Sequence, residues 1–326
     1  MLGEEKRRRL RDGLVIPAHP LALRADKTLD ERRQRDLTRY YIACGAGGVA
    51  VGVHTTQFEI REFGLYDRVL AVAAEEAAHL LLVAGVVGPT EQAVAEAKVA
   101  AGLGYDLALV AMHGWGTAPD EEILDGIRAV AEVLPVFGFY LQPAIGTRRF
   151  GYRFWRSFAE ISGVEAIKIA PFDRYATVDV VRAVIDAGRA DEIALYTGND
   201  DNIVADLLTP YRFAGTTVHI VGGLLGQWAV WTDEAVALHA EVRRIVRADE
   251  PVPLELLARG VRLTDANAAV FDAANDFRGS IAGVNEVLAR EGYLAGNWCL
   301  ADHECLSPGQ SDQISRVIAS RDTSDA

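Results

Sequence analysis

Lys168 is the residue of this sequence whose type and position point most directly to chemistry. Among 33 basic side chains only four are lysines, and Lys168 alone lies inside an apolar stretch, residues 164–170. Alternation along that stretch puts Lys168 on one face with Ala166 and Ala170, inside the predicted fold. Burial disfavours the ammonium form, and a neutral lysine amine attacks carbonyl groups to form Schiff bases. The alternative is a lysine paired with a carboxylate on a neighbouring strand.

The apolar stretch before it, residues 135–140, ends in a tyrosine that could relay protons beside Lys168. Alternation predicts that Gly138 and Tyr140 face inward, and that Phe139 packs outward against helices. The missing side chain of Gly138 would leave space below the tyrosine ring. A positioned phenol can act as a general acid or base. The alternative is a packed aromatic ring whose hydroxyl is satisfied by hydrogen bonding.

Hydroxyl and imidazole side chains follow two further apolar stretches. Thr55 and Thr56 come after residues 48–53, where their hydroxyls and backbone N–H groups could hold a carboxylate or phosphate; the alternative is a helix N-cap. His54 and His113 are expected in the pocket, as acid–base groups or as polar lining. The histidines are scattered singly, without the spacing of known metal motifs, so we expect no metal site.

The elements that position these residues alternate strictly between strand and helix. Eight strands in such alternation over about 220 residues are typical of an α/β fold of the (β/α)8 TIM-barrel type. A doubly wound open sheet is the main competitor, but its glycine-rich first turn is absent around His19. The predicted strands are 13–18, 48–53, 81–86, 107–110, 135–140, 164–169, 193–197 and 217–221, and the helices between them are 30–43, 66–79, 90–102, 119–132, 152–162, 177–187 and 200–208.

After the eighth predicted strand the pattern becomes purely helical. Residues 232–246, 253–273 and 279–291 are predicted as helices, followed by a turn-rich segment and one short helix. We therefore divide the chain into a (β/α)8 barrel over residues 1–226 and a C-terminal helical region and tail over residues 227–326.

Composition excludes several classes of function. The formal net charge of −13 argues against nucleic-acid and anionic-membrane surfaces. No apolar run is long enough to span a bilayer, and half of the residues are hydrophobic, so the chain can bury a large core. Three cysteines make no disulfide framework and fit a reducing compartment. We expect a cytoplasmic protein with no nucleic-acid or membrane partner.

Several motifs, taken together and in order, resemble the dihydrodipicolinate synthase / N-acetylneuraminate lyase family. The similarity extends roughly from residue 14 to residue 292 and includes the three added C-terminal helices. The motifs are the pair Thr55-Thr56, Ala84-Gly85-Val86 before a helix opening at Thr90, Tyr140-Leu141-Gln142-Pro143, Ile167-Lys168, and the turn Thr197-Gly198-Asn199-Asp200.

The resemblance implies a class I aldolase-type lyase that acts on a 2-oxo acid, such as pyruvate. Lys168 would form the imine, Tyr140 would relay protons with the help of the Thr56 hydroxyl, and the backbone at Thr55 and Thr56 would hold the carboxylate. Gly198 would lie close to the substrate. Members of the family are usually tetramers without a metal or organic cofactor, so we expect no cofactor and a homo-oligomer, either a dimer or a tetramer.

The sequence departs from the synthase pattern where a second substrate would bind. Gln57-Phe58 replaces a Gly-Glu pair, Ala144 and Ile145 occupy the positions of an arginine run, and the segment 111–115 lacks a tyrosine pair. We therefore predict a substrate other than that of lysine biosynthesis, either a sugar-derived or an aromatic 2-oxo acid. Two alternatives remain: a catalytically silent member that binds a 2-oxo acid as a sensor or partner protein, and a metal-dependent or phosphate-binding barrel enzyme.

Overall fold

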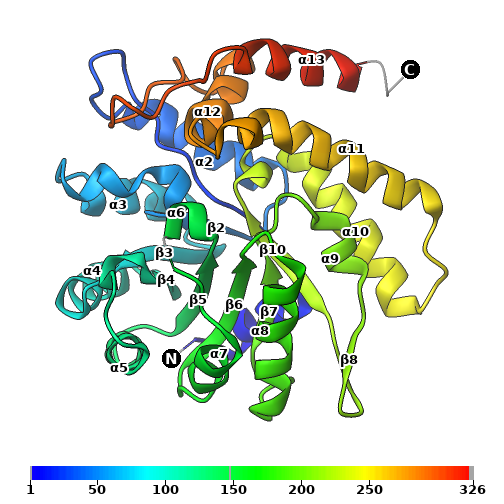
Figure 1. The fold of residues 1–326 in the computed structure, drawn as a ribbon. Helices are drawn as coiled ribbons and strands as arrows, with labels where there is room; N and C mark the ends of the chain where they lie inside the picture. The colour runs from blue at the N-terminus through cyan, green and yellow to red at the C-terminus, as the bar shows by residue number, and fades with distance from the viewer. Residues whose placement is uncertain (1, 147, 323–326) are drawn as a thin grey trace.

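Eight parallel strands form a closed barrel in the computed structural model, which describes residues 2–146 and 148–322 (Figure 1). Each strand pairs with its neighbours in the order β1-β10-β7-β6-β5-β4-β3-β2, and a parallel bridge between Ala18 and Ala50 closes the ring. The strands are β1 (Val15–Pro17), β2 (Gly48–Val51), β3 (Leu81–Val87), β4 (Leu107–Ala111), β5 (Val136–Leu141), β6 (Val164–Ala170), β7 (Ala194–Thr197) and β10 (Ile220–Leu225).

Helices alternate with these strands and surround the barrel, so the predicted (β/α)8 fold is confirmed (Figure 1). Among the described residues no helix is both long enough and apolar enough to cross a membrane. The surrounding helices are α2 (Glu31–Ala43), α3 (Tyr66–Ala77), α4 (Thr90–Gly102), α5 (Asp120–Ala131), α6 (Pro143–Gly146), α7 (Tyr152–Ala159), α8 (Arg174–Asp186), α9 (Ile203–Leu208) and α10 (Thr232–Ala248).

The strands are apolar on both faces because each strand lies between two cores. Side chains such as Ile16, Leu109 and Phe137 fill the barrel interior, while Ile167 and Ile169 pack against the surrounding helices. Strands that are buried on both faces are expected to read as nearly continuous hydrophobic runs. The sequence therefore identifies such strands readily, but it shows only weakly which face turns inward.

A helix that the sequence analysis did not predict closes the lower end of the barrel. This helix, α1 (Glu4–Asp12), places the fully buried Leu10 in the same core as the barrel interior. The hydroxyl of Tyr196 on β7 donates a 2.7 Å hydrogen bond to the Leu10 carbonyl. Arg7 also forms a bidentate pair with Glu165, at the start of β6. Helix α1 is therefore mostly charged, but its one buried residue, Leu10, covers the lower end of the barrel core.

The eighth barrel strand lies later in the chain than predicted. The residues predicted as that strand begin in a two-stranded hairpin of β8 (Tyr211–Phe213) and β9 (Thr216–Val218), and β10 then starts at Ile220. Gly222 lies in β10 just beyond the residues predicted as the eighth strand, 217–221, and it allows the strand to continue there. A Cβ on Gly222 would lie 2.5 Å from the Leu14 carbonyl oxygen, so only glycine permits this close passage beside the barrel wall.

The C-terminal helices lie over the end of the barrel at which the strands finish (Figure 1). Helix α10 packs against α9 and β1, as the eighth helix of such a barrel does. The following helices are α11 (Leu254–Val270), α12 (Ser280–Arg290) and α13 (Gln310–Asp322), with a short 3-10 turn, η5 (Ala273–Asn275), between the first two. The division of the chain at residues 226 and 227 stays a prediction.

Candidate active site

Lys168 points into the barrel, as the alternation along its strand predicted. It lies on β6, and its neighbours Ala166 and Ala170 belong to the interior core. The side chain is 8% exposed, and its Nζ lies 4.2 Å from the centroid of the Phe139 ring. Among the residues that the structure describes, Lys168 makes no hydrogen bond and no ion pair. Its amine is therefore free to react.

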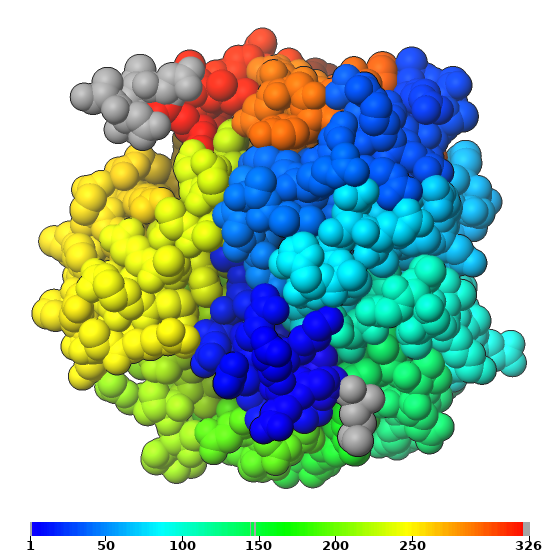
Figure 2. Space-filling model, turned by 180° about the vertical axis from the view of Figure 1, so that it is seen from behind, coloured from blue at the N-terminus to red at the C-terminus, as the bar shows by residue number. Residues whose placement is uncertain are grey.

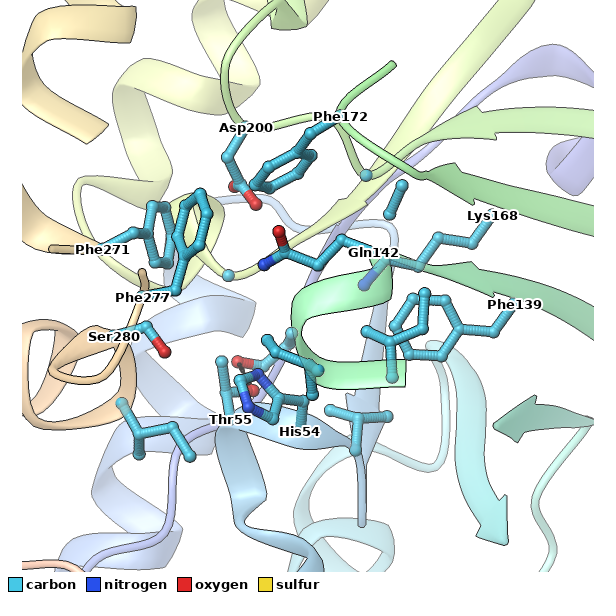
Figure 3. Close-up of a pocket in the computed structure, with 18 residues that line it drawn as sticks. His54, Thr55, Phe139, Gln142, Lys168, Phe172, Asp200, Phe271, Phe277 and Ser280 are labelled. Carbon is cyan, nitrogen blue, oxygen red and sulfur yellow. Dashed lines mark hydrogen bonds between the residues drawn. The ribbon is translucent and has the colours of Figure 1, made fainter. Parts of the chain in front are cut away.

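Lys168 lines a cavity of about 60 Å³ at the end of the barrel where the strands finish (Figure 3). This volume accommodates a few water-sized groups. Strand ends supply one side of the cavity, and the C-terminal region covers the other with Phe271, Phe277, Ser280 and Ile281. The rings of Phe172 and Phe277 meet edge to face at 5.5 Å. The cavity is therefore mainly apolar, with a few polar groups directed into it.

The other charged group of the cavity is Asp200, in the turn after β7. Burial raises the pKa of the Asp200 carboxyl, and the charge of Lys168 opposes that shift. Burial likewise lowers the pKa of Lys168, and Asp200 opposes it. The backbone N–H of Gln227 donates a 3.2 Å hydrogen bond to the carboxylate. Two buried groups whose pKa values approach each other from opposite sides can exchange a proton near neutral pH.

Gly198 precedes this turn and makes room for the lysine. A Cβ at Gly198 would lie 2.5 Å from Cε of Lys168 and 2.7 Å from Cβ of Ala170. Real Cβ atoms do not approach other atoms so closely, so a larger residue would displace the lysine side chain. Gly198 also lines the cavity, and its contact with a substrate stays a prediction.

A buried polar network holds the turn that carries Gly198 and Asp200. Asp206 accepts hydrogen bonds from the hydroxyl of Thr197 at 2.7 Å and from the side-chain amide of Asn199 at 2.9 Å. The amide oxygen of Asn199 accepts in turn from the backbone N–H of Phe172, at 3.0 Å. Because these groups are nearly all removed from water, the network fixes the turn after β7 against the end of β6.

His54 and Thr55 form the lower side of the cavity (Figure 3). Burial, with a smaller contribution from the charge of Lys168, lowers the pKa of His54 to about 4, so its ring is neutral at physiological pH. The hydroxyl of Thr55 donates a 2.8 Å hydrogen bond to the Ala18 carbonyl, which ties the end of β2 to that of β1.

The prediction that Tyr140 faces the lysine is wrong, because strand β5 presents its other face to the interior. Tyr140 packs in the helical layer, 5.1 Å from the ring of Trp155, and Phe139 occupies the position beside Lys168. Gly138 makes room for Phe158 of α7, whose Cζ would lie 2.5 Å from a Cβ there. Gly138 therefore accommodates a helix and does not enlarge the barrel.

Thr56 and His113 lie outside the cavity. The Thr56 hydroxyl donates to the His19 carbonyl at 2.6 Å and accepts from the Gly52 backbone N–H at 3.0 Å, behind the cavity wall. The ring of His113 lies against that of Phe58 in a tilted arrangement, with the centroids 4.5 Å apart, and neither residue lines the cavity. Both residues therefore support the wall, and the predicted contacts of Thr56 and His113 with substrate are not found in this geometry.

Residues of the cavity that the sequence analysis missed come mainly from the C-terminal region and from the β5 and β7 turns. Asp200 belonged to a motif that was noted, but its carboxylate was given no role. A buried carboxylate opposite the lysine was the available signal. The amide of Gln142 also reaches the cavity (Figure 3). Phe271, Phe277 and Ser280 carried no signal, because they lie about 100 residues from Lys168.

Known proteins resemble this chain in sequence and in fold. The chain is 28% identical to the N-acetylneuraminate lyase of Citrobacter koseri over 214 residues, which are 64% of this chain and 70% of that protein. No protein-family profile matches the chain. This similarity to an N-acetylneuraminate lyase agrees with the family that the sequence motifs resemble.

Solved structures share the fold of this chain over nearly its whole length. A prophage protein of the dihydrodipicolinic acid synthase family from E. coli K12, in complex with pyruvate, has a TM-score of 0.77 at 16% identity, with 94% of this chain and 97% of that chain covered. A dihydrodipicolinate synthase from Bacillus anthracis has a TM-score of 0.76 at 18% identity, covering 94% and 98%.

Proposed function

We propose that this protein is a Schiff-base lyase of the class I aldolase type that acts on a 2-oxo acid through Lys168. The observation that carries the proposal is a buried lysine with a lowered pKa and no partner among the described residues, which faces a cavity at the end of the barrel where such enzymes react. The similarity of the chain to an N-acetylneuraminate lyase supports it.

The proposed chemistry uses the two charged groups of the cavity. The neutral Lys168 amine attacks the carbonyl carbon of the 2-oxo acid, and the carbinolamine loses its hydroxyl as water when protonated. In carbon–carbon cleavage the resulting iminium accepts the electron pair of the breaking bond and becomes an enamine. In carbon–oxygen cleavage it accepts the pair of an adjacent carbon–hydrogen bond as the proton leaves, and the enamine then expels the protonated hydroxyl as water. We assign the proton transfers to Asp200, because its raised pKa suits a group that both donates and accepts near neutral pH.

The proposed substrate follows from the lining of the cavity. No arginine is among the described residues that line it, so a second carboxylate would find no guanidinium partner. Gln142, Ser280 and the neutral His54 offer hydrogen bonds, and the phenylalanines offer apolar contact. We infer a sugar-derived or aromatic 2-oxo acid, held at its carboxylate by the backbone near Thr55, and not the substrate of the lysine-biosynthetic synthase.

We also propose a cytoplasmic homo-oligomer, a dimer or tetramer, with no nucleic-acid partner. An exposed apolar stripe on α11 supports association of copies: Leu254 is 82% exposed and Val261 71% exposed, with Leu257 between them. Residues at this spacing share one face of a helix.

Trapping the imine tests the proposed function. Incubation with pyruvate and sodium borohydride should add one reduced pyruvyl group to the wild-type protein, detected by intact-protein mass spectrometry and mapped to Lys168. The variant Lys168→Ala should gain none. Lys98→Ala, which removes an exposed lysine on α4, should behave as wild type. Asp200→Asn should form the adduct at least about tenfold more slowly, the usual contribution of a positioned acid or base being larger still.

Two results would contradict the proposed function. If Lys168→Ala gains the adduct as fast as wild type, the imine forms elsewhere. If a panel of 2-oxo acids modifies no protein, while calorimetry shows that pyruvate binds, the chain is a silent member of the family that acts as a sensor or partner protein.

A further inference from the structure

A basic groove lies at the end of the barrel opposite to the cavity of Lys168. Arg11, His219, Arg243 and Arg247 line it, and we call these four residues the arginine groove. They come from α1, from the residue between β9 and β10, and from α10. Figure 2 shows α1 in dark blue beside the yellow α10 on this side of the molecule. A concentration of positive charge is unexpected in a chain whose formal net charge is −13.

Two groups in the arginine groove are buried without a partner. Nε of Arg243 and Nδ1 of His219 are inaccessible to water and accept or donate no hydrogen bond among the described residues. Arg243 also forms no ion pair within the part of the chain that the structure describes. Burial and the neighbouring Arg247 lower the pKa of Arg243. A buried guanidinium N–H without an acceptor costs free energy unless an anion satisfies it.

The spacing of the arginines adds to this cost. Arg243 and Arg247 are four residues apart on one face of α10, where like charges destabilise a helix. Arg247 lies at the helix C-terminus, which favours a positive charge, and it approaches Asp12 at 3.7 Å. Arg244, on the next face, pairs with Glu250. Arg243 has no carboxylate partner among the described residues and lies away from the helix C-terminus. Its position in the groove therefore needs another explanation.

The space around Arg243 is large enough for a ligand. Two cavities, of about 400 and about 610 Å³, both include Arg243 and Arg247 in their walls. Each cavity has one carboxylate in its wall, Asp191 in the smaller and Asp12 in the larger, against three arginines and one histidine. Positive charge therefore prevails in both.

We propose that the arginine groove binds the phosphoryl group of a small molecule, at a site separate from the Schiff-base centre. A guanidinium presents paired N–H donors that match phosphate oxygens, and His219 offers a further donor. The guanidinium of Arg243 and the ring of His219 are half-buried side chains of the groove wall, and they would donate to the phosphoryl oxygens from their accessible edges.

Calorimetric titration with inorganic phosphate and with glucose 6-phosphate tests this proposal, at constant ionic strength set by sodium chloride. Saturable binding is expected for wild type, weakened at least about tenfold in Arg243→Gln and in His219→Asn, since a charge-assisted hydrogen bond contributes about 1.5 kcal/mol or more. Arg262→Gln, which removes an exposed arginine paired with Glu255 on α11, is the matched control. Tighter binding of glucose 6-phosphate than of phosphate would identify a phosphorylated metabolite, and the reverse would identify the free ion.

The result that overturns the proposal is binding that does not saturate, or binding that is equal in wild type and Arg243→Gln. Circular dichroism of each variant confirms folding, and Arg243→Lys retains the charge without the paired donors, so it should bind at an intermediate strength. Lys168→Ala should bind phosphate as wild type does. Loss of phosphate binding in Lys168→Ala would place the anion in the upper cavity and contradict the arginine groove.

Discussion

Lysine environments differ sharply in this protein, and the difference sets Lys168 apart from Lys6 and Lys27. Lys6 pairs with Asp106 at 2.7 Å, and Lys27 pairs with Asp302 at 2.5 Å. Both lysines are partly exposed, and each has a carboxylate partner. Lys168 instead has burial as the larger influence on its pKa and a carboxylate as the smaller one. Its neutral fraction at a given pH is therefore larger than that of an ordinary lysine.

Tyr140 provides a test at the scale of one residue. Because its ring packs beside Trp155 and its hydroxyl bonds to the Phe150 backbone, Tyr140→Phe should leave the rate of borohydride-trapped adduct formation within about twofold of wild type. The lost hydrogen bond should lower the free energy of unfolding by about 1 kcal/mol. Kinetics of adduct formation and urea unfolding measure the two effects. An adduct rate reduced about a hundredfold would instead show that the phenol reaches the reacting carbon.

At the scale of elements, strand β5 shows what a periodic pattern leaves open. Its residues are apolar at every position, so alternation separates two sets of side chains but does not say which set faces the barrel. Phe137 packs 5.2 Å from the interior ring of Tyr196, and this contact across the barrel selects the orientation. In β6 a single lysine among small residues marked the interior face, so the same reasoning succeeded there.

Helix α1 provides the test at this scale. Leu10→Ala should lower the free energy of unfolding by about 2–5 kcal/mol, because it removes a fully buried side chain from the lower end of the barrel core. Arg8→Ala, on the exposed face of the same helix, should change it by less than about 0.5 kcal/mol. Urea denaturation of both variants gives the comparison. Equal stability of the two would show that α1 does not close the barrel.

At the scale of the whole molecule, buried neutral histidines link stability to pH. His19 is fully buried between the loop after β1 and helix α2, and its ring lies 2.8 Å from the Pro20 carbonyl and 2.9 Å from the Thr38 hydroxyl. Burial lowers its pKa to about 4. The unfolded chain, with a histidine pKa of about 6.5, binds the proton first as the pH falls. The stability that the neutral ring of His19 contributes is therefore fully present above pH 6.5 and is lost as the pH falls toward 4.

Removing this histidine should flatten that dependence. Between pH 6.5 and pH 4 the contribution of His19 amounts to about 3 kcal/mol, at roughly 1.4 kcal/mol per pKa unit. His19→Gln should therefore lose less stability over this range than wild type, whatever its absolute stability. His79→Gln, at an exposed position, should follow the wild-type curve. Unfolding measured at several pH values compares the slopes, and parallel slopes for wild type and His19→Gln would contradict the buried neutral ring.

The sequence by itself determined the order of strands and helices, the barrel and the interior position of Lys168, because these depend on local periodicity and on one polar residue in an apolar run. Only the tertiary structure decided which face of β5 turns inward and where the eighth strand begins. Both depend on contacts between side chains far apart in the chain, such as Phe137 with Tyr196 and Gly222 with Leu14.

The environment of the amine also belongs to the tertiary structure. The pKa shifts of Lys168 and Asp200 arise from burial that several strands and the C-terminal cover produce together. The arginine groove likewise joins α1, the end of the β8–β9 hairpin and α10, which are distant in the sequence. Local pattern cannot reveal such clusters, because desolvation and charge proximity exist only once the chain has folded.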